Sequence, residues 1–180
     1  MKKLLLLIVT VVASLTASAQ FYVGGDIGFG SRKSGGERTT TIKVMPEIGY
    51  NLTNSVAVGT KIGAEYNKTG GTKMALFNLD PYLRYTYYKS ELVSLFVDGG
   101  VDLGIGKTSV KGSSSGAAVT YGVGFRPGIA LTLNPKFSLV AHLGFLGYEG
   151  ANHRAKEGGA AEVWGLDISN NLSFGFYYNF

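Results

Sequence analysis

The feature that most constrains the fold is a two-residue alternation of bulky apolar residues with smaller or polar ones. The last nine residues, LSFGFYYNF, show it in Leu172, Phe174, Phe176, Tyr178 and Phe180. A period of two places such a set on one face of a β-strand. A long apolar strand at a free chain end is an aggregation hazard in a soluble domain, so this pattern raises the question of which solvent the strand meets.

The alternation recurs along the chain and divides it into eight candidate strands. Most have ten residues or more, which suits membrane-crossing strands of about 9–11 residues better than the soluble average of about 5–6. The sequence therefore predicts an all-β protein, an eight-stranded antiparallel up-and-down transmembrane β-barrel. The expected strands are 21–31, 39–52, 56–67, 73–88, 92–106, 118–133, 137–148 and 162–180.

The first 19 residues, MKKLLLLIVTVVASLTASA, have a different character. Two lysines precede a short apolar run, and Ala17-Ser18-Ala19 forms a small-residue cleavage signal before Gln20. The run is too short to cross about 30 Å of hydrocarbon as a helix, so it reads as a cleaved signal peptide. We expect a signal peptide at 1–19 and a barrel domain at 20–180. The chain has no cysteine, which excludes disulfide and cysteine–metal chemistry and fits an exported bacterial envelope protein.

The face opposite the bulky residues carries glycines and nearly all the strand charges. The interior of an eight-stranded barrel has room only for side chains, which small and charged residues suit. We therefore expect the bulky face to meet lipid and the other face to line the lumen. The expected inward polar residues are Asp26, Lys43, Glu47, Lys61, Glu65, Asp80, Arg84, Asp98, Asp102, Arg126, His142 and Asp167.

Strand registers predict that these charges pair. A turn at 53–55 places Glu47 opposite Lys61 and, in the same register, Lys43 opposite Glu65. One register of the hairpin at 73–106 pairs Arg84 with Asp98, although its turn allows others. Because an unpaired charge in a narrow lumen is costly, we interpret these residues as a plug of salt bridges rather than a transport or catalytic site.

Three prolines, Pro46, Pro81 and Pro127, fall inside the expected strands. Proline cannot donate to a strand ladder and marks edges or bulges. Each begins a hairpin-like unit: MPEIGYNLTNSVAVG, DPYLRYTYYKSELVSLFVDGG and RPGIALTLNPKFSLVAHLG. We expect a bulge near each proline rather than a broken strand.

The breaks between strands alternate in length. The breaks at 52–55, 88–91 and 134–136 are short, whereas those at 31–38, 67–73, 107–118 and 149–161 are longer, as in outer-membrane barrels with short periplasmic turns and longer outer loops. The longer breaks are basic, so they either contact lipopolysaccharide phosphates or an anionic partner, or serve solubility alone. Their basic residues are Arg32, Lys33, Arg38, Lys68, Lys73, Lys107 and Lys111.

The signal peptide, the P-x-[IL]-x-Y and glycine hairpin units and the aromatic end resemble the outer membrane protein beta-barrel domain family. This family belongs to the OmpA/OmpX-like eight-stranded barrels, and the present version is similar to those of Bacteroidetes. The resemblance implies insertion into a bacterial outer membrane. It also implies that Phe174, Phe176, Tyr178 and Phe180 form the signal by which the barrel-assembly machinery recognises its clients.

On this basis we expect a monomeric structural protein that stabilises the envelope or presents a surface to lipopolysaccharide or a partner. A narrow porin-like channel for small solutes is the alternative. An enzyme is not expected, because Ser138 and His142 lie about 13 Å apart along one strand, too far for a nucleophile and its base. We expect no cofactor, no metal and no nucleic-acid partner.

Overall fold

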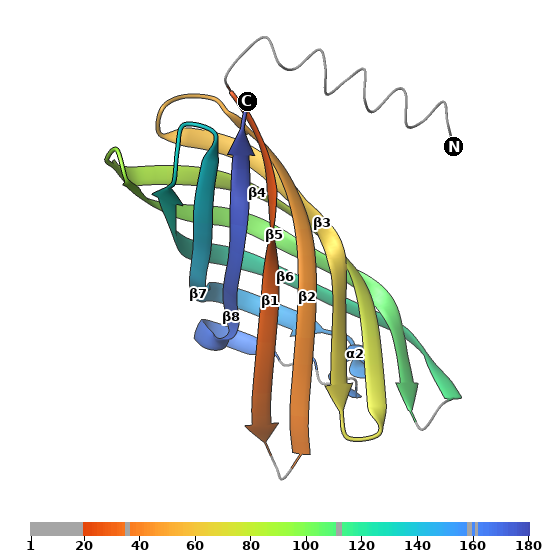
Figure 1. Cartoon of the computed structure of the whole chain (residues 1–180). Helices are drawn as coiled ribbons and strands as arrows, with labels where there is room; N and C mark the ends of the chain where they lie inside the picture. The colour runs from red at the N-terminus through yellow and green to blue at the C-terminus, as the bar shows by residue number, and fades with distance from the viewer. Residues whose placement is uncertain (1–19, 35–36, 111–112, 158–159, 161) are drawn as a thin grey trace, which may run out of the picture.

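Eight strands form one closed antiparallel barrel in chain order, and β8 pairs with β1 (Figure 1). The computed structural model describes residues 20–34, 37–110, 113–157, 160 and 162–180, with the backbone alone at 32–34, 37, 110, 113–115, 163 and 167–172. The signal peptide expected at 1–19 lies outside these residues. The elements are β1 (Phe21–Ser34), β2 (Glu37–Asn51), β3 (Val56–Thr69), β4 (Thr72–Lys89), β5 (Val93–Val110), β6 (Ser113–Thr132), β7 (Phe137–Ala151), α2 (His153–Glu157) and β8 (Val163–Asn179).

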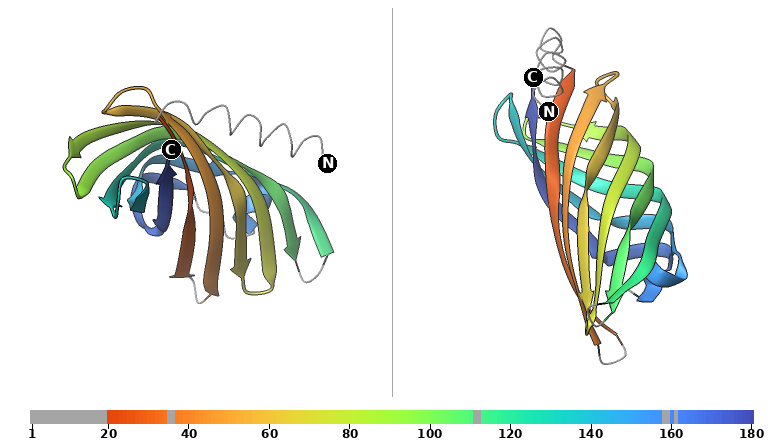
Figure 2. Two further views of the ribbon diagram at one scale, coloured as in Figure 1. Left: turned by 45° about the horizontal axis from the view of Figure 1, so that its top comes forward. Right: turned by 90° about the vertical axis from the view of Figure 1, so that its right-hand side faces the viewer.

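The strands extend further at one end of the barrel than the sequence suggested. The chain passes from β1 to β2, from β3 to β4 and from β5 to β6 with only a few residues between the strands, and these hairpins project at one end (Figure 2). The prediction of longer loops at 31–38, 67–73 and 107–118 is therefore wrong in extent, because strands include most of these residues. Their polar residues continue the backbone ladders, since strand pairing does not require apolar side chains at the rim. We call this end outer, and the end holding the three tight turns and Phe180 inner.

The faces of the strands follow the predicted division, with one correction. Bulky residues such as Phe29, Phe77 and Trp164 are exposed on the outside, as expected for a surface that meets lipid. The inside, however, is not only small and charged. It also contains large buried side chains, namely Tyr22, Met45, Met74, Leu76, Tyr82, Phe96, Phe145 and Tyr177.

The inward glycines explain how these rings fit into a narrow barrel. A Cβ atom on Gly49 would overlap the ring of Tyr22, and one on Gly128 would overlap the ring of Phe96. A ring on one strand therefore occupies the space that a missing side chain leaves on another. The glycine-rich inner face is thus the counterpart of the buried aromatic residues.

Irregular pairing occurs at fewer prolines than expected. The β6–β7 register shifts between Phe125 and Gly128, so an irregularity lies near Pro127 as predicted, although its extra residue is on β7, where three residues oppose two of β6. The bulges predicted at Pro46 and Pro81 are wrong, because the registers on either side of both prolines are unchanged. At these two positions the backbone pairing with one neighbouring strand is interrupted, but no extra residue is inserted.

The extra residue on β7 changes the face of one aromatic residue, which the sequence did not predict. The β7–β8 register shifts between Leu143 and Phe145, and the intervening Gly144 has a φ of 94°. Glycine adopts such a backbone conformation without a steric penalty. The shift turns Phe145, which strict alternation places on the lipid side, into the lumen, where it is fully buried.

Apolar side chains occupy both ends of the lumen, and charges lie between them. Near the inner end, Tyr22, Ala57, Phe96, Val140 and Tyr177 pack together. Near the outer end, a second group contains Met74, Leu76, Ala118, Ala151 and Ala155, the last of these from α2. Within the described residues, no helix has the length and apolarity needed to cross a bilayer.

Candidate functional site

The site with the greatest density of functional groups is a buried ionic network, here called the inner cluster: Asp26, Glu47, Lys61, Arg84, Asp98 and His142. Lys61 Nζ donates a hydrogen bond of 2.6 Å to Asp26 Oδ2 and lies 3.6 Å from Glu47 Oε2. All six residues are buried, and the Glu47 side chain is 0% exposed. Burial removes the screening that weakens ion pairs in water, which strengthens each contact. It also makes an unpaired charge costly, so the network is stable only when every charge keeps its partner.

Arg84 makes the largest number of contacts in the inner cluster. Its Nε and Nη2 atoms donate to the two oxygen atoms of Asp98 at 2.6 and 2.7 Å, a bidentate arrangement. Nη2 also donates to Tyr177 Oη at 2.8 Å and lies 3.4 Å from Glu47 Oε1. The guanidinium carbon lies 3.9 Å from the centre of the Phe96 ring, a cation–π contact. Arg84 therefore joins the charges to the aromatic layer beneath them.

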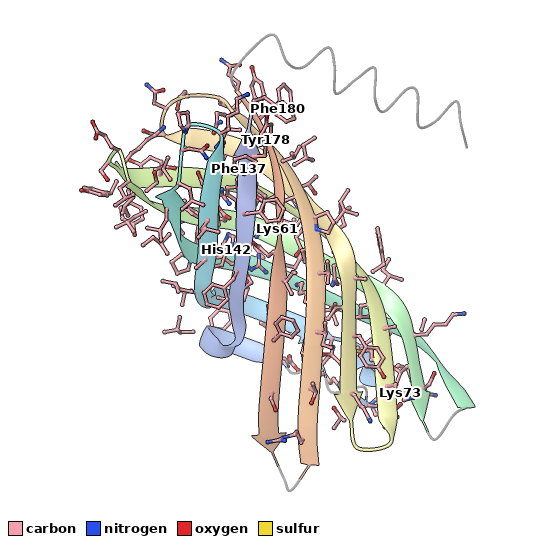
Figure 3. All side chains as sticks on the ribbon, viewed as in Figure 1. Lys61, Lys73, Phe137, His142, Tyr178 and Phe180 are labelled. Carbon is pink, nitrogen blue, oxygen red and sulfur yellow. The ribbon has the colours of Figure 1, made fainter. Side chains whose placement is uncertain are left out.

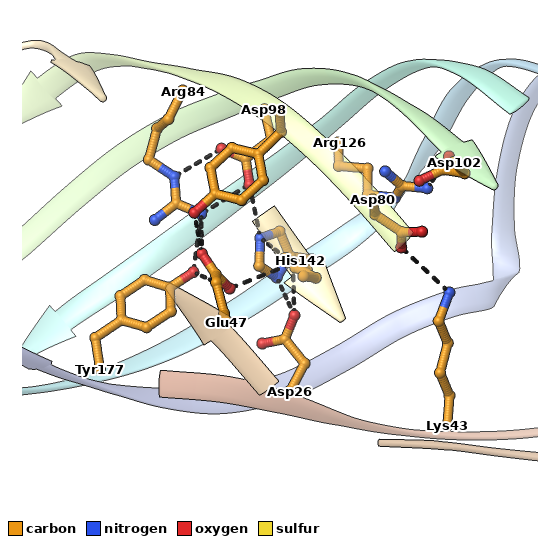
Figure 4. Close-up of polar contacts among 12 residues, drawn as sticks. Asp26, Lys43, Glu47, Asp80, Arg84, Asp98, Asp102, Arg126, His142 and Tyr177 are labelled. Atoms are coloured by element: carbon orange, nitrogen blue, oxygen red, sulfur yellow. Dashed lines mark hydrogen bonds and ion pairs between the residues drawn. The ribbon is translucent and has the colours of Figure 1, made fainter. Parts of the chain in front are cut away.

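His142 lies between two carboxylates. Its Nε2 atom is 3.1 Å from Asp98 Oδ2 and 3.3 Å from Lys61 Nζ, while Nδ1 is 3.3 Å from Asp26 Oδ2. Its ring packs edge-on against Phe96, with 5.4 Å between the ring centres. The imidazole thus connects the Lys61 side of the cluster to the Arg84 side (Figure 4).

Three tyrosine hydroxyl groups complete the network. Tyr22 and Tyr82 share a hydrogen bond of 2.6 Å, Tyr82 donates to Glu47 Oε1, and Tyr177 donates to Glu47 Oε2 at 3.1 Å. Counted with the ionic contacts, the polar interactions of this layer join side chains from β1, β2, β3, β4, β5, β7 and β8. The layer therefore links strands on opposite sides of the barrel across its lumen.

A second ionic group, here called the outer cluster, consists of Lys43, Glu65, Asp80, Asp102 and Arg126. Lys43 Nζ is 3.7 Å from both Glu65 Oε2 and Asp80 Oδ2, and Arg126 pairs with Asp102. Figure 4 shows Lys43, Asp80, Asp102 and Arg126 displaced along the barrel from the inner cluster. Lys43 and Glu65 are 31% and 19% exposed, so water reaches this layer more easily.

α2 covers part of the outer mouth above the outer cluster. Asn152 Oδ1 accepts from the backbone N–H of Ala155 at 2.9 Å, which caps the start of the helix, and Thr108 Oγ1 donates to the Arg154 carbonyl at 2.8 Å. At the exposed rim, Lys156 Nζ donates to Glu162 Oε2 at 2.6 Å. This bond lowers the pKa of the Glu162 carboxyl and raises the pKa of Lys156.

The lumen pairs expected from the sequence come together. Glu47 lies opposite Lys61, Lys43 opposite Glu65 and Arg84 opposite Asp98, and each pair is in ionic contact. Sequence reasoning missed the pairing of Asp26 with Lys61, the central position of His142 and the three tyrosines. The sequence did contain a signal for the three tyrosines, because Tyr22, Tyr82 and Tyr177 occupy the inward positions of their strands.

The other predicted residues whose side chains the structure describes lie away from the lumen. Arg38, Lys68, Lys73 and Lys107 are exposed on strands rather than loops, whereas Lys111 and the side chains of Arg32 and Lys33 fall outside what the structure describes. At the inner end, Phe174 and Phe176 are exposed, and Tyr178 packs between Phe137 and Phe180, with ring centres 5.1 and 5.0 Å apart. Figure 3 shows Phe137, Tyr178 and Phe180 far from Lys73. The assembly signal at the aromatic end stays a prediction.

Every ionisable group of the inner cluster has a partner within the cluster. Each cation contacts a carboxylate, and the described atoms of His142 contact Asp26, Asp98, Lys61 and Phe96. In the part of the chain that the structure describes, no group of histidine, cysteine and acidic residues is arranged to hold a metal ion.

Comparison with known proteins supports the same architecture. The chain is similar to neisserial surface protein A, with a TM-score of 0.61, 18% identity, and coverage of 91% of this chain and 98% of that one. The N-terminal barrel domain of Pseudomonas aeruginosa OprF gives a TM-score of 0.54, 14% identity, and coverage of 91% and 98%. OprG from the same species gives 0.54, 12% identity, and coverage of 89% and 96%. At these identities the likeness shows the fold.

None of the curated proteins has a sequence that matches this chain significantly. The sequence does match the outer membrane protein beta-barrel domain over residues 4–180, which includes every described strand. A closed eight-stranded barrel with an apolar outer surface agrees with that match. The chain belongs to the outer membrane protein beta-barrel domain family.

Proposed function

We propose that this protein is a closed, non-conducting barrel that has a structural role in the outer membrane. The observation that carries the proposal is the inner cluster, whose polar contacts join seven of the eight strands across the lumen. A stable wall of ion pairs and rings opposes a continuous water path. It also ties together strands that are distant along the chain.

The physical basis is the cost of opening such a layer. Separating Arg84 from Asp98, or Lys61 from Asp26, would leave charges unpaired in a region with little water. Breaking one buried pair costs about 3–5 kcal/mol. Because several pairs share atoms, they must open together, so thermal fluctuations rarely open the lumen. A barrel of this kind suits envelope stabilisation better than solute passage.

The alternative function, a narrow channel for small solutes, is distinguished by conductance in planar bilayers. The full chain is expected to insert without steady ohmic steps. As a positive control, a variant that removes bulk from the plug, Phe96→Ala with Arg84→Ala, is expected to conduct once inserted. Lys89→Gln at the inner rim serves as a matched surface control and is expected to behave as wild type. The closed-lumen proposal would be overturned if the wild-type protein gave steady conductance steps and if Glu47→Gln or Lys61→Gln made these steps smaller.

The structural role itself is tested in the bacterium that makes the protein. Loss of the chain is expected to weaken the outer-membrane barrier to detergent and to large hydrophobic antibiotics. Wild-type protein is expected to restore the barrier, and Lys89→Gln is expected to restore it equally. Uptake of small solutes that depends on the chain, with the barrier intact, would favour the channel instead.

A further inference from the structure

Four basic residues follow one another around the outer rim of the barrel wall. Arg38, Lys68, Lys73 and Lys107 lie on β2, β3, β4 and β5, respectively, and all are exposed. We call these four residues the basic stripe. Figure 3 shows Lys73 near the outer ends of the strands, away from the lumen residues Lys61 and His142.

The strand alternation shows that the basic stripe faces outward. Asn67, Met74 and Thr108, the neighbours of Lys68, Lys73 and Lys107 along their strands, are buried in the barrel. The lysines therefore share the lipid-facing side of the wall with Tyr66, Phe77 and Ile105, which lie closer to the middle of the same strands. A cation at this height faces the headgroup region rather than the barrel mouth.

The strand register brings the stripe residues together. Lys68 lies directly opposite Lys73, while Lys107 lies diagonally from Lys73, two residues from its partner Ser109. Directly opposite residues have Cβ atoms about 4.5–5.5 Å apart, and diagonal neighbours are about 7–8 Å apart. Two like charges in direct opposition destabilise a sheet unless an anion lies between them.

The stripe has no anionic counterpart on the protein among the residues whose side chains are described. The ion pairs of those residues involve other basic groups, and the rim residue Lys156 is paired with Glu162 on the α2 side. The outward residues that are described on β6, β7 and β8 are apolar in the corresponding belt, including Tyr121, Leu146 and Leu166. Among the described side chains, the basic residues of the outer rim that have no carboxylate partner therefore lie on β2, β3, β4 and β5.

We propose that the basic stripe binds the phosphate groups of lipopolysaccharide in the outer leaflet. Lysine and arginine side chains form charge-assisted hydrogen bonds with phosphate oxygen atoms. The apolar belt below the stripe would contact the acyl chains of the same molecule, so one ligand matches both surfaces. An anion between Lys68 and Lys73 also removes the repulsion that their register creates. The inference does not depend on whether the lumen conducts.

The test compares matched double variants of the full chain in detergent. Lys68→Gln with Lys73→Gln removes two stripe charges, whereas Lys89→Gln with Lys136→Gln removes two charges at the inner rim. Binding of lipid A carrying both phosphates is measured by native mass spectrometry, with dephosphorylated lipid A and inorganic phosphate as separate arms. The stripe variant is expected to bind lipid A on the order of tenfold more weakly, and the inner-rim variant to bind as wild type.

Thermal unfolding, followed by the heat-dependent shift on gels, separates lost binding from lost folding. Without lipid A, the stripe variant is expected to be at least as stable as wild type, because a repulsive pair has been removed. With lipid A, wild type is expected to gain more thermal stability than the variant. Lys68→Arg with Lys73→Arg is expected to keep the wild-type gain.

Four results would overturn the proposal. Three are equal losses in the stripe and inner-rim variants, undiminished binding of dephosphorylated lipid A, and displacement of lipid A by inorganic phosphate at comparable concentration, the last of which would indicate a simple anion site. The fourth is undiminished lipid A binding by the stripe variant, which would leave an anionic protein as the occupant. None of these outcomes bears on conductance, so failure here is distinguishable from failure of the closed-lumen proposal.

Discussion

The two ionic layers of the lumen use the same strands in different ways. On β2, β3, β4 and β5, each inner-cluster residue lies four positions from an outer-cluster residue, as Arg84 does from Asp80 on β4. In the inner cluster, Arg84 is 8% exposed and pairs with Asp98 at 2.6 Å. In the outer cluster, Lys43 is 31% exposed and lies 3.7 Å from its partners.

The difference shows that charge alone does not make a plug. On its lower side the inner cluster is covered by Tyr22, Phe96 and Tyr177, and the Tyr177 hydroxyl donates a hydrogen bond to Glu47. The outer cluster lies between this layer and the mouth, where screening weakens ion pairs. We therefore assign the inner cluster to closure and stability, and the outer cluster to a smaller contribution.

The largest expected difference in stability between the two layers comes from removing one cation from each layer in turn. Arg84→Ala leaves Asp98 and Glu47 without their shared cation, and it should lower the free energy of unfolding by about 3–5 kcal/mol. Lys43→Ala, the matched change in the outer cluster, should cost about 1 kcal/mol or less, because Lys43 is partly exposed and lies 3.7 Å from both of its partners. Urea unfolding in lipid vesicles measures both values. Equal losses would contradict the distinction between the layers.

Two glycines on β6 allow the same comparison through packing. A Cβ on Gly128 would overlap the Phe96 ring of the inner layer, so Gly128→Ala should cost about 1–3 kcal/mol. Gly122 adjoins Asp102 of the outer cluster, and its nearest atoms lie at 3.2 Å or more from the added Cβ, so Gly122→Ala should stay within about 0.5 kcal/mol of wild type. Unfolding of both variants under identical conditions decides the matter. A larger loss at Gly122 would mean that the inner layer is the looser of the two.

Removal of single hydroxyl groups tests individual hydrogen bonds of the inner layer. Tyr82→Phe deprives Glu47 of a donor and Tyr22 of its partner, and should cost about 1–3 kcal/mol. Tyr22→Phe removes one hydrogen bond and leaves the Tyr82–Glu47 contact in place, so it should cost about 1 kcal/mol. If Tyr22→Phe cost more than Tyr82→Phe in equilibrium unfolding, the hydrogen bond from Tyr82 to Glu47 would not be the more important one.

The smallest effect is expected at the outer rim and depends on pH. The pKa of Glu162 is lowered by Lys156, so their contact stabilises the rim above the ordinary pKa of a carboxyl group and is lost as the pH falls through the lowered value. The raised pKa of Lys156 extends this stabilisation to alkaline pH. The protection of the α2 amides, expressed relative to the intrinsic exchange rate at each pH, should therefore fall slightly on acidification, since both groups are exposed. Glu162→Gln should abolish this dependence, and an unchanged acid response in that variant would exclude the pair as its cause.

Sequence periodicity was sufficient for the barrel and for part of its interior. The positions of Glu47 and Lys61 followed from one turn, because in an antiparallel pair a single register fixes every facing residue. The same rule placed Lys43 opposite Glu65. Contacts between strands that are distant in sequence, such as that of Arg84 with Tyr177, do not follow from any one hairpin.

The remaining errors have local physical causes. Phe145 changes face because Gly144 adopts a positive φ within a bulge, and strict alternation cannot anticipate an added residue. Pro46 and Pro81 interrupt single rungs without a bulge, since the neighbouring rungs keep the register. The stripe lysines were assigned to loops because polar sequence resembles a turn, whereas backbone pairing continues through Lys68 and Lys73.

The most direct test of the closed lumen is an experimental structure at a resolution that places individual water molecules in the barrel. The account predicts direct contacts of Arg84 with Asp98 and of Lys61 with Asp26, and ordered water that reaches the outer cluster but stops at the ring of Phe96. An unbroken file of water from one mouth to the other, passing between separated inner-cluster charges, would contradict it.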